Sequence, residues 1–289
     1  MAVIKTENLQ FAYSLGMPNE VKVLNDINVE IEKGEFVGLI GPTGCGKSTL
    51  ISHLNGLLRP TEGKVFLNDA DIWEATTNMR DVRFKVGLSF QYPEYQLFEE
   101  TVYKDIAFGP KNMGLSEDEI KERVLSAAKF CQVEDKLLQI SPFELSGGQK
   151  RRVAIAGVMA MRPQVLVLDE PAAGLDPEGR KSILEGVKRY QQEEGATVIL
   201  VSHSMEDITR YADKVMVMQG GNIAMFDTTE QVFSRADELL SMGLAVPQIT
   251  QIFLKLKEMG IDIVTDVYTI DYAVKELKKY KNRKTEGDA

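Results

Sequence analysis

The chain contains the sequence Gly41-Pro42-Thr43-Gly44-Cys45-Gly46-Lys47-Ser48, which matches the phosphate-binding pattern G-x-x-x-x-G-K-[ST]. An apolar run over residues 36–40 precedes this loop and predicts a buried strand. The residues that follow, Thr49-Leu50-Ile51 and then Leu54, have helical spacing. The order strand, loop, helix is the setting that the pattern needs in order to bind phosphate. The sequence therefore predicts a nucleoside triphosphate site.

The residue types in this loop suit an anion. Glycines let consecutive backbone N–H groups turn inward, and the helix that starts near Gly46 directs its positive end to the same place. We expect Lys47 to reach the β- and γ-phosphates and the Ser48 hydroxyl to contact Mg²⁺. The alternative is an ordinary glycine-rich turn, but the pattern should arise by chance in only about 1% of chains this long.

The composition is that of an ordinary globular protein. The 289 residues are 44% hydrophobic and 27% charged, which allows one large α/β domain with an appendage, or two domains. A net charge of −9 argues against nucleic acid as a partner. The two cysteines, Cys45 and Cys131, form no disulfide framework and favour a reducing compartment.

No signal peptide and no apolar run of the ~18 residues that a membrane span needs are found in the sequence. We therefore expect a soluble chain that meets a membrane only through partners.

Alternating and continuous apolar runs predict two kinds of strand. Residues 3–13 and 21–31 alternate roughly between polar and apolar, which predicts strands. Residues 165–168 and 197–201 are continuous apolar runs, typical of central parallel strands. A further strand is predicted over residues 84–90.

Two segments predict helices. Residues 92–161 are mostly helical by pattern, and Ser116 with Glu119 forms the signature of a capping box. After Asp227 the spacing is helical again, with Thr269 as a possible cap of the last helix. The lysine-rich segment 275–284 predicts a frayed, solvated tail, with a membrane-surface or partner contact as the alternative.

Two further motifs complete a candidate ATP site. An apolar strand ends in Asp169 and Glu170, which could hold Mg²⁺ and orient or deprotonate a water. Apolar strands often end in acidic residues, so this motif alone decides little. The sequence Leu145-Ser146-Gly147-Gly148-Gln149 precedes a helical pattern, and its glycine amides and Ser146 could hold a second anion. An ordinary helix cap is the alternative for this motif.

With these motifs the chain resembles the nucleotide-binding subunits of ABC transporters over residues 1–225. Tyr13, Gln91 and His203, each of which alone would more often be structural, stand where that family has its adenine-stacking aromatic, Q-loop glutamine and switch histidine. The resemblance implies that Glu170, His203 and Gln91 are catalytic and that Ser48, Gln91 and Asp169 hold Mg²⁺. The implied ATP-binding residues are Tyr13, Gly41, Pro42, Thr43, Gly44, Cys45, Gly46, Lys47, Ser48, Thr49, Ser146, Gly147, Gly148 and Gln149.

The family's D-loop matches Ala173-Gly174-Leu175-Asp176, with Ala and Gly where Ser and Ala are commoner. The implied fold is α/β, with a P-loop NTPase (RecA-like) core, an N-terminal antiparallel β subdomain, a helical signature subdomain over about residues 92–161 and a small helical C-terminal extension. The ATPase domain would span residues 1–226, and the extension, residues 227–289, would contact the other subunit of a dimer. In that dimer Ser146 would act on ATP held by the other subunit.

The chain also contains the sequence Gln91-Tyr92-Pro93-Glu94-Tyr95-Gln96-Leu97-Phe98. This segment resembles the corresponding segment of energy-coupling factor transporter ATPases, in particular the second of their two paralogous ATPases. The segment lies where such ATPases receive a helix of a membrane subunit. The resemblance implies ATP-driven uptake of a vitamin or transition-metal ion, with this chain peripheral at the cytoplasmic face of the membrane. The implied partners are a paralogous ATPase, a transmembrane scaffold and a membrane-embedded substrate-binding subunit. A conventional ABC importer or exporter ATPase is the alternative, and a soluble ABC protein of translation or DNA maintenance fits less well.

Overall fold

The computed structural model describes the backbone of residues 1–287 and side chains through Asn282. Its N-terminal part is an antiparallel sheet of strand order β2-β1-β4-β5. Long alternating strands form it because one face packs on the core and the other meets solvent. The predictions of strands at residues 3–13 and 21–31 are confirmed. The four strands are β1 (Ala2–Tyr13), β2 (Val21–Glu32), β4 (Glu62–Leu67) and β5 (Ala70–Asp71).

A six-stranded sheet of order β10-β9-β3-β8-β7-β6 forms the centre of the molecule. All of its neighbouring pairs are parallel except β10 with β9. Every residue of β3, β7 and β8 is buried, which explains their continuous apolar runs. The strands are β3 (Phe36–Ile40), β6 (Val86–Ser89), β7 (Val165–Asp169), β8 (Thr197–Val201), β9 (Lys214–Gln219) and β10 (Asn222–Thr228).

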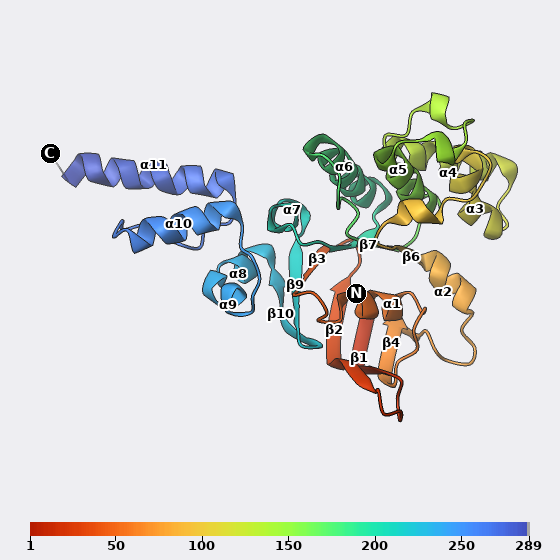
Figure 1. The fold of residues 1–289 in the computed structure, drawn as a ribbon, viewed down its shortest axis with the longest axis horizontal. Helices are drawn as coiled ribbons and strands as arrows, with labels where there is room; N and C mark the ends of the chain where they lie inside the picture. The colour runs from red at the N-terminus through yellow and green to blue at the C-terminus, as the bar shows by residue number, and fades with distance from the viewer. Residues whose placement is uncertain (288–289) are drawn as a thin grey trace.

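The central sheet separates two hydrophobic clusters. Phe36 and Ile40 of β3 face a cluster that includes helix α6 (Pro177–Glu194), whereas Val37 and Leu39 face one that includes helix α1 (Lys47–Leu54) and the antiparallel sheet. Figure 1 shows the same layers, with α6 and α7 (Met205–Tyr211) above the sheet and α1, β1, β2 and β4 below it.

The predicted strand at residues 84–90 begins too early. Phe84 and Lys85 end a short helix, α2 (Met79–Lys85), and strand β6 starts only at Val86. The helix is capped by the side chain of Asn78, which accepts from the N–H of Arg80. Because Val82 is its only buried residue, its apolar pattern is too weak to mark it in the sequence.

The helical subdomain contains three helices and three 3-10 turns, on the right of Figure 1. The predicted capping box at Ser116 and Glu119 is confirmed and starts helix α4. The elements are η1 (Pro93–Gln96), α3 (Val102–Asn112), α4 (Glu117–Phe130), η2 (Asp135–Leu137), η3 (Pro142–Glu144) and α5 (Gly147–Met159).

The C-terminal extension has four helices, of which the last two extend away from the sheets (Figure 1). Phe233 and Leu239 of the first two helices pack into the main core, whereas Phe253 and Val267 belong to a small cluster of their own. Thr269 caps the last helix as predicted, since its Oγ1 accepts from the N–H of Tyr272. The helices are α8 (Thr229–Phe233), α9 (Ala236–Ser241), α10 (Gln248–Glu258) and α11 (Ile270–Gly287).

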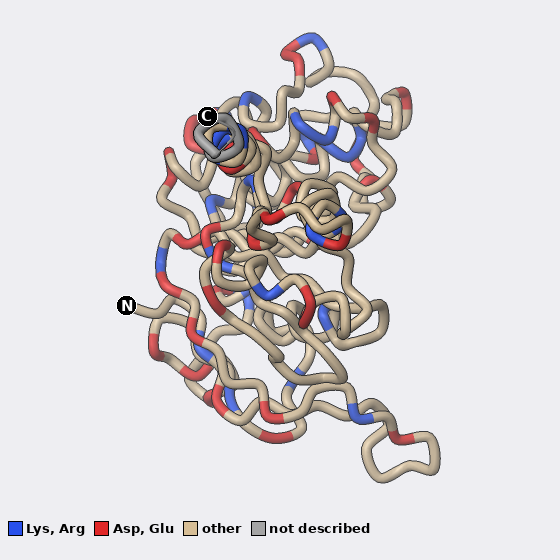
Figure 2. The backbone as a smooth tube through the Cα atoms, turned by 90° about the vertical axis from the view of Figure 1, so that its left-hand side faces the viewer, with Lys and Arg blue, Asp and Glu red and all other residues tan. Residues whose placement is uncertain are grey.

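The prediction of a frayed tail at residues 275–284 is wrong for the backbone, which continues as helix α11. The helix is held at its start, where Ala273 is buried, and Lys279 pairs with Glu276 one turn on. The side chains of residues 283 and 284 lie outside the described residues. Figure 2 shows basic and acidic positions interspersed along the chain. Within the described part, no helix is both long enough and apolar enough to cross a membrane.

Candidate functional site

The phosphate-binding loop connects β3 to α1, as the sequence predicts. Gly46 precedes the helix at φ 105°, in the left-handed region that favours glycine. Gly41 lies so close to β9 that a Cβ there would stand 2.5 Å from the carbonyl oxygen of Met218. The Lys47 amino group donates to the loop carbonyls of Gly41, at 2.7 Å, and Pro42, at 3.0 Å. The loop therefore holds its own cation over the space that its backbone encloses.

Asp169, the last residue of β7, reaches the start of α1. The Ser48 hydroxyl donates to its Oδ2 at 3.1 Å. Burial raises the pKa of Asp169, while the Ser48 hydrogen bond and the Lys47 charge oppose that shift. A hydroxyl and a carboxylate are oxygen ligands of the kind that Mg²⁺ prefers, with the rest of its shell supplied by waters and phosphates. The donor set fits this ion.

Glu170 follows in an unusual backbone conformation, with φ 50°. Its N–H donates to the carbonyl of Val201 on β8 at 3.0 Å. Burial, and then the neighbouring charge of Asp169, raise the pKa of Glu170 to about 7. Its Oε1 is buried without a hydrogen-bond partner among the described residues and lies 3.6 Å from His203 Nε2. A carboxyl with a pKa near neutrality is matched to accepting a proton.

The imidazole of His203 is neutral near pH 7, because burial and the Lys47 charge lower its pKa. Tyr13 lies at the rim of the same cleft, 44% exposed, with its hydroxyl 3.4 Å from Thr49 Oγ1. Its ring meets Phe11 edge-on at 4.8 Å between ring centroids. An exposed ring supported from behind offers a face on which a base can stack.

One cleft of about 470 Å³ brings most of the predicted site residues together. Gly41, Pro42 and Cys45 form the loop behind it, and the Cys45 thiol is buried. Val23 and Val201, two apolar residues outside the sequence motifs, also line this cleft. The lining residues are Tyr13, Val23, Thr43, Gly44, Gly46, Lys47, Ser48, Thr49, Gln91, Asp169, Glu170, Val201 and His203.

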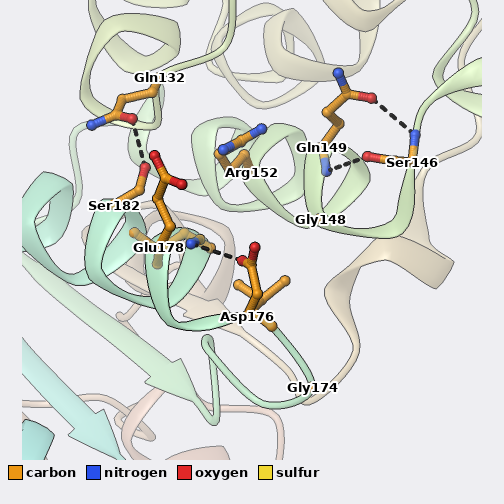
Figure 3. A pocket seen from close by; sticks show the side chains of 12 residues that line it. Gln132, Ser146, Gly148, Gln149, Arg152, Gly174, Asp176, Glu178 and Ser182 are labelled. Atoms are coloured by element: carbon orange, nitrogen blue, oxygen red, sulfur yellow. Dashed lines mark hydrogen bonds between the residues drawn. The ribbon is translucent and has the colours of Figure 1, made fainter.

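The signature residues do not line this cleft. Ser146, Gly148 and Gln149 border a second one, of about 480 Å³, together with Gly174 and Asp176 of the D-loop (Figure 3). Within the described chain the two anion-binding helix starts therefore open onto separate spaces.

The signature helix begins with a capping box. Gln149 N–H donates to Ser146 Oγ at 3.4 Å, and Ser146 N–H donates to Gln149 Oε1 at 2.9 Å (Figure 3). Asp176 caps α6 in the same way, accepting from the N–H of Gly179 at 2.9 Å. The two bonds between Ser146 and Gln149 use the side-chain amide oxygen of Gln149 to orient the start of α5. The N–H groups of Gly147 and Gly148 remain at the tip of the helix.

Arg151 belongs to none of the sequence motifs described above. In the structure Arg151 is buried between the segment after Gln91 and the D-loop, and pairs with Glu94. Its position four residues before the buried Ile155 places it on the inner face of α5, which is the one signal that the sequence offered.

Comparison with known proteins agrees with this geometry. The ABC transporter family profile matches residues 24–173, more than half of the chain. An energy-coupling factor transporter ATP-binding protein of Caldanaerobacter subterraneus is 53% identical over 277 residues, 96% of this chain and 97% of the relative. The protein of the same name from Clostridium acetobutylicum is 55% identical over 275 residues, 95% of this chain and 96% of the relative.

Solved structures show the same fold. The cbiO1 protein of Clostridium perfringens, described as part of the ABC transporter complex cbiONQ, superimposes with a TM-score of 0.74 at 36% identity, covering 90% of this chain and 97% of that one. A dimeric ATP-binding cassette in a post-hydrolysis state, bound to ADP and phosphate, gives 0.70 at 27% identity, covering 78% and 98%. The fold prediction is confirmed. The chain belongs to the ABC transporter family and, within it, to the ATP-binding proteins of energy-coupling factor transporters.

Proposed function

We propose that this chain hydrolyses ATP to drive micronutrient uptake by an energy-coupling factor transporter, through closure of an ATPase dimer on ATP and its opening after hydrolysis. The observation that carries the proposal is the group around Glu170. A buried carboxyl with a pKa of about 7 adjoins the Ser48–Asp169 pair, in the cleft that the phosphate-binding loop forms. These residues place a loop that can bind an anion, oxygen ligands for a cation and a proton acceptor in one cleft.

The loop residues hold the triphosphate. The inward N–H groups of the phosphate-binding loop and the Lys47 ammonium surround the β- and γ-phosphates, and Tyr13 stacks on the adenine. Ser48 and Asp169 hold Mg²⁺, with Gln91 as a further ligand from the rim of the cleft. The ion, when bound, neutralises charge that develops on the phosphate oxygens.

Glu170 orients the attacking water and accepts its proton. As the water oxygen bonds to the γ-phosphorus, the bond from that phosphorus to the bridging oxygen breaks and ADP leaves. The neutral imidazole of His203, whose Nε2 lies 3.6 Å from Glu170 Oε1, donates a hydrogen bond to the transferred phosphoryl group. Each group acts at an atom where charge or a proton moves in the transition state.

The second anion site acts in trans. Because Ser146 and the amides of Gly147 and Gly148 open onto a different space from Lys47, a second ATPase subunit is required to bring such a helix start to the γ-phosphate. The dimeric form of the related cassette bound to ADP and phosphate supports this arrangement. Closure excludes water other than the nucleophile, and loss of the γ-phosphate weakens the contact.

The partners follow from the family. We infer a paralogous ATPase, a transmembrane scaffold and a membrane-embedded substrate-binding subunit, with this chain peripheral at the cytoplasmic face. The transported molecule is a vitamin or a transition-metal ion. The extension, residues 227–289, contacts the second ATPase.

The test is Glu170→Gln in the assembled complex. The amide keeps the shape of the side chain but accepts no proton, so ATP should bind with unchanged affinity while turnover falls on the order of 10²–10⁴-fold. Nucleotide binding is measured with a fluorescent ATP analogue and turnover by phosphate release. Hydrolysis at the wild-type rate would remove Glu170 from the mechanism.

A further inference from the structure

Arg151 is one of the few charged residues in the molecular interior, with 3% of its surface exposed. Its Nε donates to one carboxylate oxygen of Glu94 at 3.0 Å, and its Nη2 donates to the other at 2.8 Å. Its Nη1 donates to the backbone carbonyl of Ala173. The guanidinium also lies over the ring of Tyr92, 5.7 Å from the centroid. One side chain thus satisfies partners on two other segments.

These segments are far apart in the sequence and have different parts in the proposed mechanism. Glu94 belongs to turn η1, just after Gln91. Arg151 lies on α5, whose first turn carries Ser146. Ala173 opens the D-loop. A planar guanidinium with five donors can hold a carboxylate bidentately and still reach a carbonyl, whereas an ammonium acts as a point charge.

The contact at Ala173 continues to the proton acceptor. The N–H of Ala173 donates to the carbonyl of Glu170 at 3.2 Å, closing the turn that follows β7. Ala173 therefore accepts from Arg151 through its oxygen and donates to Glu170 through its nitrogen. Glu170 is held in a left-handed conformation that most residues avoid, so the hydrogen bonds of this turn help to set where its carboxyl points.

The contact at Glu94 continues to the surface. Its neighbour Tyr95 is 83% exposed, and Phe98, which follows η1 in the chain, forms an exposed edge-on pair with Phe108 at 4.9 Å between ring centroids. A force on turn η1 from this side would act on Glu94, whose side chain is only 16% exposed and is held by Arg151.

We propose that Arg151 is a positioning residue that couples turn η1 to the D-loop and, through Ala173, to Glu170. A displacement of η1 moves the Glu94 carboxylate. The Arg151 guanidinium follows, because its two hydrogen bonds to Glu94 are directional. The Ala173 carbonyl, which accepts from the same guanidinium, then moves with it. The inference rests on the proposed function, since it assigns a route by which an event at the partner-facing surface reaches the hydrolytic group.

The test compares stimulated with basal hydrolysis. The steady-state ATPase rate is measured for the complete complex and for the two ATPase subunits without their membrane partners, with Arg151→Lys as the main variant. We expect the ratio of the stimulated to the basal rate to fall on the order of tenfold, with KM for ATP within about twofold of wild type, because a displaced η1 no longer moves the Ala173 carbonyl when the directional bonds of the guanidinium are lost. A merely structural role lowers both rates together and leaves their ratio unchanged.

Arg123→Lys is the matched control. Arg123 lies in the same helical subdomain and donates to the carbonyl of Met161 at 2.9 Å, and among the described residues no hydrogen bond or ion pair joins it to η1 or the D-loop. This variant should keep the wild-type ratio.

Glu94→Gln is the second variant and decides the matter if Arg151→Lys does not fold. It removes the charge of the partner without touching α5 or Ala173, and it should reduce the ratio in the same way. The double variant should be no worse than the more severe single one, since both changes break the same link.

An unchanged ratio in Glu94→Gln, or in a folded Arg151→Lys, overturns the inference. Failure of the proposed function has a different result. In that case the wild-type complex would not hydrolyse ATP, or Glu170→Gln would match wild type. A wild-type complex that is stimulated by its partners, blocked by Glu170→Gln and indifferent to Arg151→Lys would refute the coupling alone.

Discussion

Glu170 occupies a backbone region that costs a non-glycine residue on the order of 1–3 kcal/mol. Its carboxyl is also buried, with one oxygen unpaired among the residues that the structure describes. Both features oppose folding, and both serve the proposed chemistry, since a solvated carboxylate would have a pKa too low to accept a proton effectively at neutral pH. The residue that we propose to act on water is therefore a source of instability.

This conflict predicts that Glu170→Gln stabilises the fold in a pH-dependent way. Because burial raises the pKa of Glu170 from 4.5 to about 7, the folded chain binds more protons than the unfolded chain between these values. Wild-type stability from this group is therefore lost as the pH rises through that window, and glutamine removes the loss. Relative to wild type, the variant should gain about 2 kcal/mol between pH 5 and pH 8.

Urea unfolding of the isolated chain at these two pH values measures the effect. A constant difference between Glu170→Gln and wild type at both values would contradict the raised pKa.

At the scale of elements, sequence patterns predicted the strands, loops and helix caps that depend on neighbouring residues alone. The loop between β3 and α1, the strands β7 and β8 and the caps at Ser116 and Thr269 each depend on a few consecutive residues. Most of the site residues that the sequence predicted line the cleft beside the phosphate-binding loop, whereas Ser146, Gly148 and Gln149 of the signature line another, and all of them were identified through motif order and family resemblance rather than through periodicity.

The features that the sequence patterns did not predict depend on contacts between residues far apart in the chain. Helix α2 is short and buries only Val82, so nothing in its own residues separates it from β6. Arg151 resembles its solvated neighbours in the sequence and differs only because Glu94, 57 residues away, lies against it. The separation of Ser146 from Lys47 into two clefts is likewise a property of the fold, although the resemblance implied it.

Turn η1 presents a side chain that can be changed without disturbing the core. Tyr95→Lys should weaken assembly with the membrane subunits at least tenfold, because it places a strongly hydrated cation where an exposed aromatic surface meets a partner. ATP binding by the isolated chain should not change. Leu97, which packs against the core, is the less suitable site for the same charge. Co-purification of the complex measures assembly, and full recovery with Tyr95→Lys would place the partner elsewhere.

At the scale of the whole molecule, the end of the extension has a small hydrophobic cluster of its own, and only its partly buried Leu254 and Tyr268, among the described residues, pack against the main core. The main clusters include residues as far as Val246, while Phe253, Ile263, Val267 and Ala273 form their own cluster around α10 and α11. A cluster of this size is small for independent stability. Helices α10 and α11 are thus the part of the chain that should loosen first.

Phe253→Ala tests that separation. Phe253 is fully buried, so its truncation should destabilise the extension by about 3–5 kcal/mol and open it below the main transition. ATP affinity should stay within about twofold, since the cleft shares no residue with this cluster. Hydrogen exchange of α10 and α11, alongside nucleotide titration, gives both results. Uniform protection across the chain would show that the extension and the domain unfold together.

The order of strands in the central sheet has a consequence for synthesis. Strand β3, which carries the phosphate-binding loop, pairs only with β8 and β9, and β8 begins roughly 160 residues later along the chain. At translation rates of about 5–20 residues per second, this apolar strand waits about 10–30 s on the ribosome before any neighbour exists. Until then it is an unpaired edge of five buried-type residues, open to wrong partners. The loop that binds ATP is among the first parts of the chain to be made and among the last to be in place.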